Sequence, residues 1–236
     1  HYARLLARAL PAAGWRVAIP HWRGCSGEPN RKPRAYHSGD TAEVDWILRK
    51  FSTPVDAIGI SLGGNALLKW LGERGAAAAP LVRRAAAVSA PLDLAAAGRA
   101  LDRGLNRLLY TRMFLSTLKP KSLAQLQRFP RLFDAAKLRG ARTFREFDDI
   151  YTAPLHGFRD VDHYWTSSSS GPWLDRIRVP TLVINARNDP FLPEGALEAA
   201  TANAASGVLL EFPRTGGHVG FRGEWLARRL IEFFRT

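Results

Sequence analysis

The stretch Gly59-Ile60-Ser61-Leu62-Gly63 is a G-x-S-x-G motif, and the interpretation of the whole chain starts from it. A short apolar run, residues 55–58, comes before it, and a helical pattern, residues 65–71, follows it. A strand, a tight turn and a helix in this order hold the serine of such a motif above the edge of a sheet. The sequence therefore predicts that Ser61 is a nucleophile. The alternative is a glycine-rich turn with an incidental serine.

The neighbours of the serine have predicted roles of their own. Gly59 and Gly63 lie two residues to either side, and we expect a side chain at either position to collide with neighbouring backbone. Gly64 would let the following helix lie close to the strand. The backbone amide of Leu62, at the start of that helix, points toward the place where an oxyanion would form. Leu62 is therefore the predicted oxyanion donor.

Strand and helix patterns alternate on both sides of the motif. The expected strands are residues 15–20, 55–58, 83–89, 179–185 and 207–212, and the expected helices include residues 2–13, 65–75, 194–204 and 223–235. Strands that alternate with helices pair in parallel through right-handed crossovers. We therefore expect an α/β fold with a mostly parallel sheet.

The alternation stops between residues 92 and 172, where the sequence indicates mainly helices with several aromatic side chains. We interpret this block as an insertion that packs over the sheet as a helical lid. At 236 residues the chain is long enough for one sizeable core, and one domain is the default. The expected organisation is a single domain, residues 1–236, that carries the lid.

Composition excludes several classes of protein. Residues with hydrophobic side chains make up 46% of the chain, Cys25 is the single cysteine, and the net charge is +13. No apolar run approaches the roughly 20 residues of a membrane span, no signal peptide is visible, and no Cys/His cluster has zinc spacing. We expect a cytoplasmic protein without a metal site, with a position at the periphery of a membrane as the alternative. Because the chain does not begin with Met, we also expect a fragment that lacks its true N-terminus.

Two further residues complete a constellation with Ser61. A serine hydroxyl needs a base to take its proton, and a carboxylate to orient that base. His218 lies in a Gly-rich loop after the last expected strand, and Asp189 directly follows the strand before it. The three residues fall at the carboxyl ends of three strands in the order Ser, Asp, His, which predicts a catalytic triad. Asp93, which also follows a strand closely, is the alternative acid.

The remaining histidines are weaker candidates for the base. They are His21, His37, His156 and His163. The first two precede Ser61 and the last two lie in the helical block. We expect each to be a hydrogen-bonded structural residue or part of a pocket wall.

These motifs resemble the YheT-like subfamily of the α/β-hydrolases. The matching stretches are residues 20–30 (Pro-His-Trp-Arg-Gly-Cys-Ser-Gly-Glu-Pro-Asn), 36–41 (Tyr-His-Ser-Gly-Asp-Thr), 59–65, 185–190 (Asn-Ala-Arg-Asn-Asp-Pro) and 216–218 (Gly-Gly-His). The resemblance implies an α/β-hydrolase fold and a serine hydrolase that acts on carboxylic esters, including lipid esters, without a cofactor. It assigns the nucleophile to Ser61, the acid to Asp189 and the base to His218.

The chain departs from the family at its beginning. The resemblance implies earlier strands and a His-Gly loop that supplies a second oxyanion amide, whereas this sequence opens at the helix after that loop. It also implies a strand between the Val17 strand and the Ile58 strand. We therefore expect those two strands either to lie two strand spacings apart, about 9–10 Å, or to have collapsed together.

Positive charge is concentrated in the helical block. Residues 99–145 hold twelve Lys or Arg and only two acids, Asp102 and Asp134, which is +10 of the total +13. One interpretation is a basic, aromatic lid that meets an anionic membrane or an anionic lipid substrate. The other is a solvated helical face. No nucleic-acid motif is recognisable, so we expect no nucleic-acid partner.

The predicted function is ester hydrolysis through an acyl-enzyme, with a small-molecule or lipid ester as substrate. Two alternatives stay open. The same triad could transfer the acyl group to an alcohol, or the fold could be a catalytically silent binding module.

Overall fold

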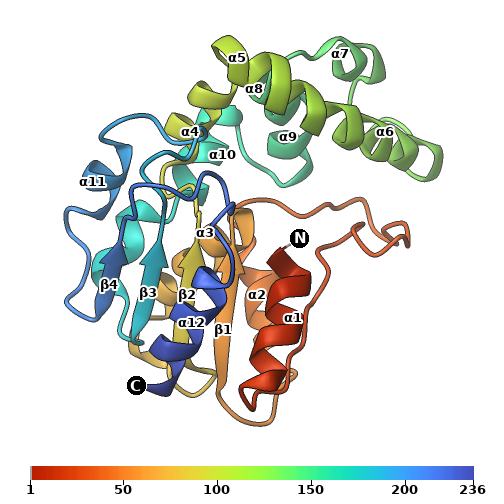
Figure 1. Ribbon diagram of the computed structural model, residues 1–236. Coiled ribbons are helices and arrows are strands. Elements are labelled where there is room, and N and C mark those ends of the chain that lie inside the picture. The colour runs from red at the N-terminus through yellow and green to blue at the C-terminus, as the bar shows by residue number, and fades with distance from the viewer. Residues whose placement is uncertain (1) are drawn as a thin grey trace.

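The computed structural model describes residues 2–236, and its centre is a parallel sheet of four strands in the order β1-β2-β3-β4. The strands are β1 (Val55–Ile60), β2 (Val82–Val88), β3 (Thr181–Ile184) and β4 (Val208–Glu211). Figure 1 shows them side by side below a group of helices. The parallel sheet confirms the fold class expected from the alternating pattern.

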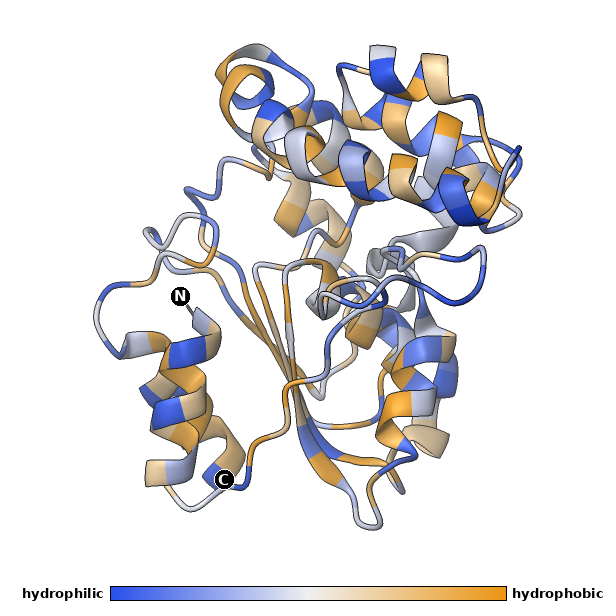
Figure 2. Cartoon of the chain, turned by 90° about the vertical axis from the view of Figure 1, so that its right-hand side faces the viewer, coloured by the Kyte–Doolittle hydropathy of each residue, from blue (hydrophilic) through white to orange (hydrophobic). Residues whose placement is uncertain are grey.

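Helices cover both faces of the sheet. Successive side chains of β2 point to opposite faces, so the strand contributes to a core on each side. Ala85 and Ala87 face a core shared with α2 (Thr41–Leu48), α3 (Leu62–Arg74) and α11 (Ala196–Thr201). Ala86 and Val88 face a second core shared with α1 (Tyr2–Ala12) and α12 (Trp225–Arg235). In Figure 2 the layer that carries both termini lies on one side of the strands. Small alanines on β2 let both layers approach closely.

A group of short helices connects β2 to β3 and forms a separate layer, which we call the cap (residues 94–168). Its elements are α4 (Leu94–Leu101), α5 (Gly104–Asn106), the π-helix η2 (Arg107–Thr111), α6 (Arg112–Arg128), α7 (Ala135–Gly140), α8 (Phe144–Phe147), the π-helix η3 (Asp148–Thr152), α9 (Ala153–Leu155) and α10 (Val161–Ser168). Figure 1 shows the cap above the strands. It has two small apolar clusters of its own, one around Trp165 and one around Phe147. The two remaining elements are short 3₁₀ helices, η1 (Gly75–Ala78) and η4 (Gly171–Arg176).

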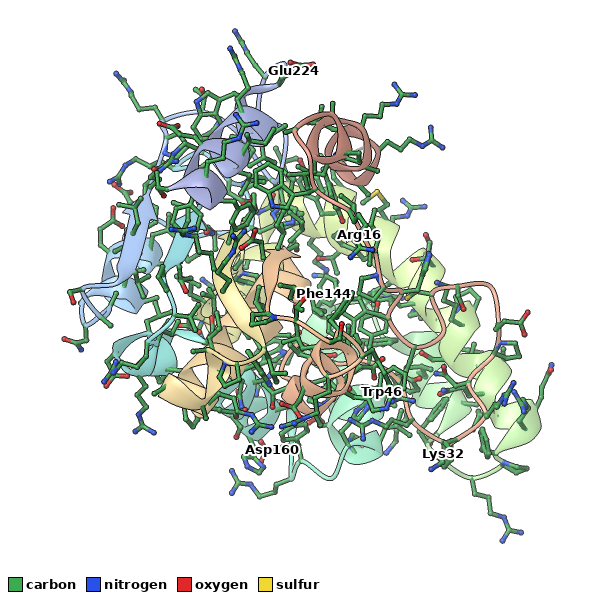
Figure 3. All side chains as sticks on the ribbon, turned by 90° about the horizontal axis from the view of Figure 1, so that it is seen from below. Arg16, Lys32, Trp46, Phe144, Asp160 and Glu224 are labelled. Atoms are coloured by element: carbon green, nitrogen blue, oxygen red, sulfur yellow. The ribbon has the colours of Figure 1, made fainter. Side chains whose placement is uncertain are left out.

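A long loop before α2 lies against the cap. Figure 3 labels Lys32 on this loop. The side chain of Gln125 donates a hydrogen bond to the carbonyl oxygen of Arg34, and Arg128 donates to that of Asn30. Because Gln125 and Arg128 both belong to α6, the cap is held to the body by this loop as well as by its own two ends.

The expected strand at residues 15–20 is wrong. These residues run extended but pair with no strand, and Trp15 contacts β1 through its side chain, whose indole N–H donates to Asp56 at 3.0 Å. Trp15 and Val17 pack on the core beneath α12, whereas Ile19 is 49% exposed. The apolar alternation in residues 15–20 therefore indicates that one side of this segment is buried. Burial of one side does not require that the backbone pairs with a strand. Among the described residues, no strand pairs with the second edge of β1.

None of the helices in residues 2–236 is both long and apolar enough to cross a bilayer.

Candidate active site

Ser61 occupies the turn between β1 and α3 in a conformation that non-glycine residues rarely adopt. Its φ is 51° and its ψ is −120°, and its backbone N–H donates to the carbonyl oxygen of Val88 at 2.8 Å. A strained backbone of this kind persists only where the surrounding structure enforces it. The bond to β2 and the first turn of α3, in which Asn65 N–H donates to Ser61 O, provide that enforcement.

The two motif glycines are not equivalent. A Cβ on Gly59 would overlap the carbonyl oxygen of Gly63 and lie 2.7 Å from the Cα of Gly64, so the strand and helix meet there backbone to backbone. A Cβ on Gly63 would meet only the Trp22 ring, at 3.9 Å, which is ordinary contact. The expectation of a collision is right for Gly59 and wrong for Gly63. Gly63 is the second residue of α3, and no atom of β1 lies within 4 Å of the place that its Cβ would occupy.

The structure brings together the three residues of the predicted triad. His218 Nε2 lies 2.9 Å from Ser61 Oγ, and His218 Nδ1 lies 2.9 Å from Asp189 Oδ2. With its proton on Nδ1, the imidazole donates to the carboxylate and accepts from the serine hydroxyl. This is the arrangement in which a base can take the serine proton while a carboxylate holds its orientation.

Each partner of Ser61 is fixed by the loop that carries it. The side chain of Asp189 is 0% exposed, and its second oxygen accepts from the Phe191 N–H at 2.9 Å, so both carboxylate oxygens are hydrogen-bonded. The loop of His218 is tied to that of Asp189, because Gly217 N–H donates to Asn188 Oδ1 at 2.8 Å. The imidazole is 20% exposed, so part of the ring remains accessible to solvent.

Leu62 is the first residue of α3, so its amide N–H has no acceptor within the helix. The N-terminus of a helix also favours negative charge through its dipole. The position of this amide, directly after Ser61, is therefore suited to receive a developing oxyanion.

Asp93, the alternative acid, has a different role. It is the N-cap of α4, and its side chain accepts from the Ala96 N–H at 2.9 Å. Asp189, not Asp93, contacts His218.

The other histidines are engaged elsewhere. His156 lies between the carbonyl oxygens of Thr152 and Ala35, at 2.8 and 2.9 Å, and so joins the cap to the loop before α2. His37 accepts from the Gly39 N–H, His163 accepts from the Arg159 N–H, and His21 lies near the carbonyl oxygen of Cys25. Hydrogen bonds to backbone account for all four, as expected.

His37 makes stability depend on pH. Burial, together with the charge of nearby His156, lowers the pKa of His37 from 6.5 to about 4, with Arg34 and Lys69 adding to the effect and Asp40 opposing it. The unfolded chain therefore binds a proton on this ring at a higher pH than the folded protein does. The contribution of His37 to the free energy of unfolding is complete above pH 6.5 and declines as the pH falls toward 4.

We expect replacement of His37 by Phe to cost stability at pH 7.5 and to cost less, or nothing, at pH 4.5, because Phe has no proton to bind. The lost acceptor for Gly39 N–H matters equally at both pH values. The measurement is the melting temperature of both proteins across this range. Asp148 acts in the opposite direction, since burial raises its pKa to about 6, so the difference between the two proteins is the informative quantity. A difference that stays constant with pH would contradict the prediction.

Asn65 is a functional residue that the sequence reasoning missed. It is 0% exposed and lies one helical turn after Ser61. Its amide group donates to the carbonyl oxygens of Ser38 and Ser168, both at 2.8 Å, and its oxygen accepts from the Ser170 N–H at 3.0 Å. It thereby fixes the start of α3 to the loop before α2 and to the end of the cap. Its signal in the sequence is a lone amide inside an otherwise apolar helix face.

Aromatic side chains of the cap reach the proposed base through one intermediary. The Phe191 ring lies against the His218 imidazole with ring centres 4.1 Å apart. Tyr110 and Phe114, from the cap, contact the Phe191 ring at 4.9 and 6.0 Å. Phe191, with the cap residues Tyr110 and Phe114 packed against it, therefore forms an apolar wall beside His218.

Within residues 2–236, no group of three or more His, Cys, Asp or Glu side chains is arranged to hold a metal ion.

Comparisons with known proteins agree with this geometry. The family model for the alpha/beta hydrolase fold matches residues 1–222. YheT of Escherichia coli (strain K12) is 37% identical over 249 residues, which cover 100% of this chain and 72% of YheT. Phospholipase ABHD3 of Mus musculus is 32% identical over 218 residues, which cover 90% of this chain and 53% of that protein. The chain thus spans about half the length of the phospholipase.

Solved structures show the same fold. The esterase PF2001 of Pyrococcus furiosus superimposes with a TM-score of 0.61 at 17% identity, covering 100% of this chain and 75% of that one. The resemblance to YheT that the motifs indicated is confirmed by the 37% identity. This chain belongs to the alpha/beta hydrolase fold family.

Proposed function

We propose that this chain hydrolyses carboxylic esters through an acyl-enzyme formed on Ser61. The observation that carries the proposal is the unbroken hydrogen-bonded series from Ser61 Oγ through His218 to the buried carboxylate of Asp189. The similarity to a phospholipase supports an ester as the substrate, and lipid esters as its class.

In the proposed reaction the oxygen of Ser61 attacks the ester carbonyl carbon while His218 Nε2 takes the hydroxyl proton. The carbonyl oxygen becomes an oxyanion and accepts a hydrogen bond from the Leu62 amide. The tetrahedral intermediate collapses when His218 passes its proton to the departing alkoxide, which leaves as the alcohol. Water then repeats the sequence on the acyl-enzyme and releases the carboxylic acid. Throughout, Asp189 holds the imidazole and stabilises its positive charge.

The apolar wall beside His218 suggests where the acyl chain lies. Tyr110, Phe114 and Phe191 offer aromatic surface and no charge on that side of the imidazole. An apolar acyl group gains about 0.8 kcal/mol for each methylene group that it buries. We therefore propose that the cap contributes to the choice of acyl chain.

A fluorophosphonate probe and a series of esters of graded acyl length test the proposal together. We expect the probe to label the wild type and not the Ser61→Ala variant, and we expect hydrolysis to yield free acid. Acid replaced by a new ester when an alcohol is added would indicate acyl transfer instead. A wild type that neither reacts with the probe nor hydrolyses any ester would indicate a silent binding module and would overturn the proposal.

A further inference from the structure

The outer side of the cap carries an exposed apolar stripe at the junction of α5, η2 and α6. Its members are Leu105, Leu108, Leu109 and Met113, which are 75%, 64%, 61% and 53% exposed. They fall within nine residues of a continuous helical run, and their shared exposure places them on its solvent-facing side. Single exposed leucines are common, but a contiguous group marks an interaction surface. Figure 1 shows α5 at the top of the cap, away from the strands.

The opposite side of the same run is firmly seated, so the stripe does not result from a helix that has rotated out of place. Thr111 is buried and its hydroxyl donates to the carbonyl oxygen of Leu101 at 2.8 Å. Leu115 is also buried, and the Asn106 amide donates to the carbonyl oxygen of Pro190 at 2.6 Å. These contacts fix the inward side, and the leucines face outward in consequence. Nothing in the packing of the cap requires leucine at those positions.

The stripe is flanked by exposed basic side chains that form no ion pair within the described residues, although the charge of Arg107 acts on the carboxyl groups of Asp102 and Glu146. Arg103, Arg107 and Arg112 are exposed, and none of them forms an ion pair within the described residues. Residues 103–133 contain seven Lys or Arg and no Asp or Glu. By contrast, Arg145 on α8 is paired with Asp162 at 2.5 Å. Arg139 and Arg142 form no ion pair within residues 2–236 either, but residues 139–145 contain no large exposed apolar side chain, so unpaired charge adjoins apolar surface at residues 103–112.

We propose that this face, formed by Leu105, Leu108, Leu109 and Met113 with the three flanking arginines, docks on the surface of an anionic phospholipid bilayer. The apolar side chains enter the region between headgroups and acyl chains, and the guanidinium groups bind lipid phosphates. Charge complementarity selects this occupant over a second copy of the chain. In a symmetric pair the same patch faces itself, so the unpaired arginines of two copies would be brought together.

The docking face is close to the proposed active site, and this step rests on the proposed function. Tyr110 and Phe114 project inward from the helical run that carries the stripe, and both contact Phe191, which lies against His218. Docking would therefore place the apolar wall of the site near the bilayer, where a lipid ester could pass to Ser61 without crossing much water.

Co-sedimentation with vesicles tests the docking face without depending on catalysis. We expect the wild-type protein to bind vesicles of phosphatidylcholine that contain about 30% phosphatidylglycerol, and to bind phosphatidylcholine alone at least about 10-fold more weakly. The preference should diminish as salt is raised above about 0.15 M, because exposed charges are then screened within about 8 Å. Ser61→Ala should bind as the wild type does, which separates docking from ester hydrolysis.

Two variants and two matched controls identify the face. Neutralising Arg103, Arg107 and Arg112 to Gln should weaken binding to the anionic vesicles by roughly 100-fold, at about fivefold for each charge near the surface. The control that changes Lys121, Arg139 and Arg142 to Gln removes the same charge elsewhere on the cap, and we expect a loss of less than about threefold for each charge there. Changing Leu105, Leu108 and Leu109 to Ser should weaken binding by at least about 10-fold. Trp46→Ser, which removes an exposed apolar side chain of α2, should not weaken it.

The same preparations show which outcomes would overturn the proposal. The arginine, leucine, tryptophan and control-charge variants, all of which leave Ser61 in place, should hydrolyse a short water-soluble ester at the wild-type rate, which would show that they are folded. An equal loss of vesicle binding in the arginine triple and in the control triple would mean that binding depends on the total charge of the cap and not on this face. Unchanged binding by the leucine triple would mean that no apolar side chain inserts. If light scattering showed that the wild type is a dimer and that the leucine triple is a monomer, the face would be assigned to a second copy of the chain.

Discussion

We expect the Ser61→Ala variant to lose ester turnover by a factor of about 10⁴ to 10⁶, because it removes the oxygen that forms the acyl-enzyme. The protein should remain folded, since the bond that holds the turn is between the backbone N–H of Ser61 and the carbonyl oxygen of Val88 and survives the substitution. Initial rates with a soluble ester and circular dichroism provide the two measurements. The turnover that remains should be what substrate binding and the Leu62 amide can support without a nucleophile.

The partners of Ser61 should behave as a unit with it. His218→Ala should cost about as much as Ser61→Ala, and the double variant should be little worse than either, because a nucleophile without its base is nearly inert. Asp189→Asn should cost as much or less, since it disturbs the tautomer and orientation of the imidazole but leaves the serine in place. A Ser61→Ala variant with wild-type turnover would contradict the whole interpretation of the site.

The strands that precede Ser61, Asp189 and His218 could be predicted because each has a recognisable pattern in its own short stretch of sequence. β3, for example, is the fully buried run Thr181–Ile184, and the turn-forming residues Asn188, Asp189 and Pro190 follow it closely. Short apolar runs that end in turn chemistry define parallel strands, and the carboxyl ends of parallel strands share one edge of the sheet. The α/β class and the YheT-like resemblance are confirmed on these grounds. The catalytic roles of the residues stay predictions.

The roles that the sequence could not assign depend on contacts between residues that are far apart in the chain. Asp93 and Asp189 both follow strands closely, and only the folded structure shows that one caps a helix while the other meets a histidine. Asn65 bonds to residues 27 and about 100 positions away, so no local pattern defines its role. Residues 15–20 alternate as a strand does, yet alternation records burial of one face and says nothing about backbone pairing.

The sequence likewise could not show which positive charges of the cap are paired and which face solvent. A count over residues 99–145 finds an excess of +10 but treats all its members alike. In the structure one of these side chains, Arg145, is paired with Asp162, and others flank exposed leucines. The side of a helix that faces solvent is set by packing, and η2 adds a further residue to the turn between Arg107 and Thr111. Simple helical periodicity would therefore misplace the residues that follow.

The two glycines of the G-x-S-x-G motif should respond very differently to the same added methyl group. In the Gly59→Ala variant the new Cβ would overlap the Gly63 carbonyl oxygen and lie 2.7 Å from the Gly64 Cα, and backbone atoms cannot rotate out of the way as side chains can. We expect a loss of about 2–3 kcal/mol in the free energy of unfolding. For a protein of this size that loss corresponds to a melting temperature roughly 4–12 °C lower.

The activity of the Gly59→Ala variant should fall further than its stability suggests. The clash lies between β1 and α3, the two elements that hold Ser61 in its strained conformation, so relief of the clash moves Ser61 relative to His218. A displacement of about 1 Å in such a site costs about 100-fold in rate. Turnover should therefore drop by about that factor at a temperature where the variant is still folded.

Gly63→Ala is the matched control, because it adds the same methyl group to the same motif. Its Cβ would meet only the Trp22 ring at 3.9 Å, and alanine is favoured over glycine inside a helix by about 0.5–1 kcal/mol. We expect this variant to melt at or slightly above the wild-type temperature and to keep turnover within about threefold of the wild-type rate. Thermal melts and initial rates of the two variants decide the matter. Equal damage from both substitutions would mean that the motif needs two glycines for a reason other than the close approach of β1 and α3.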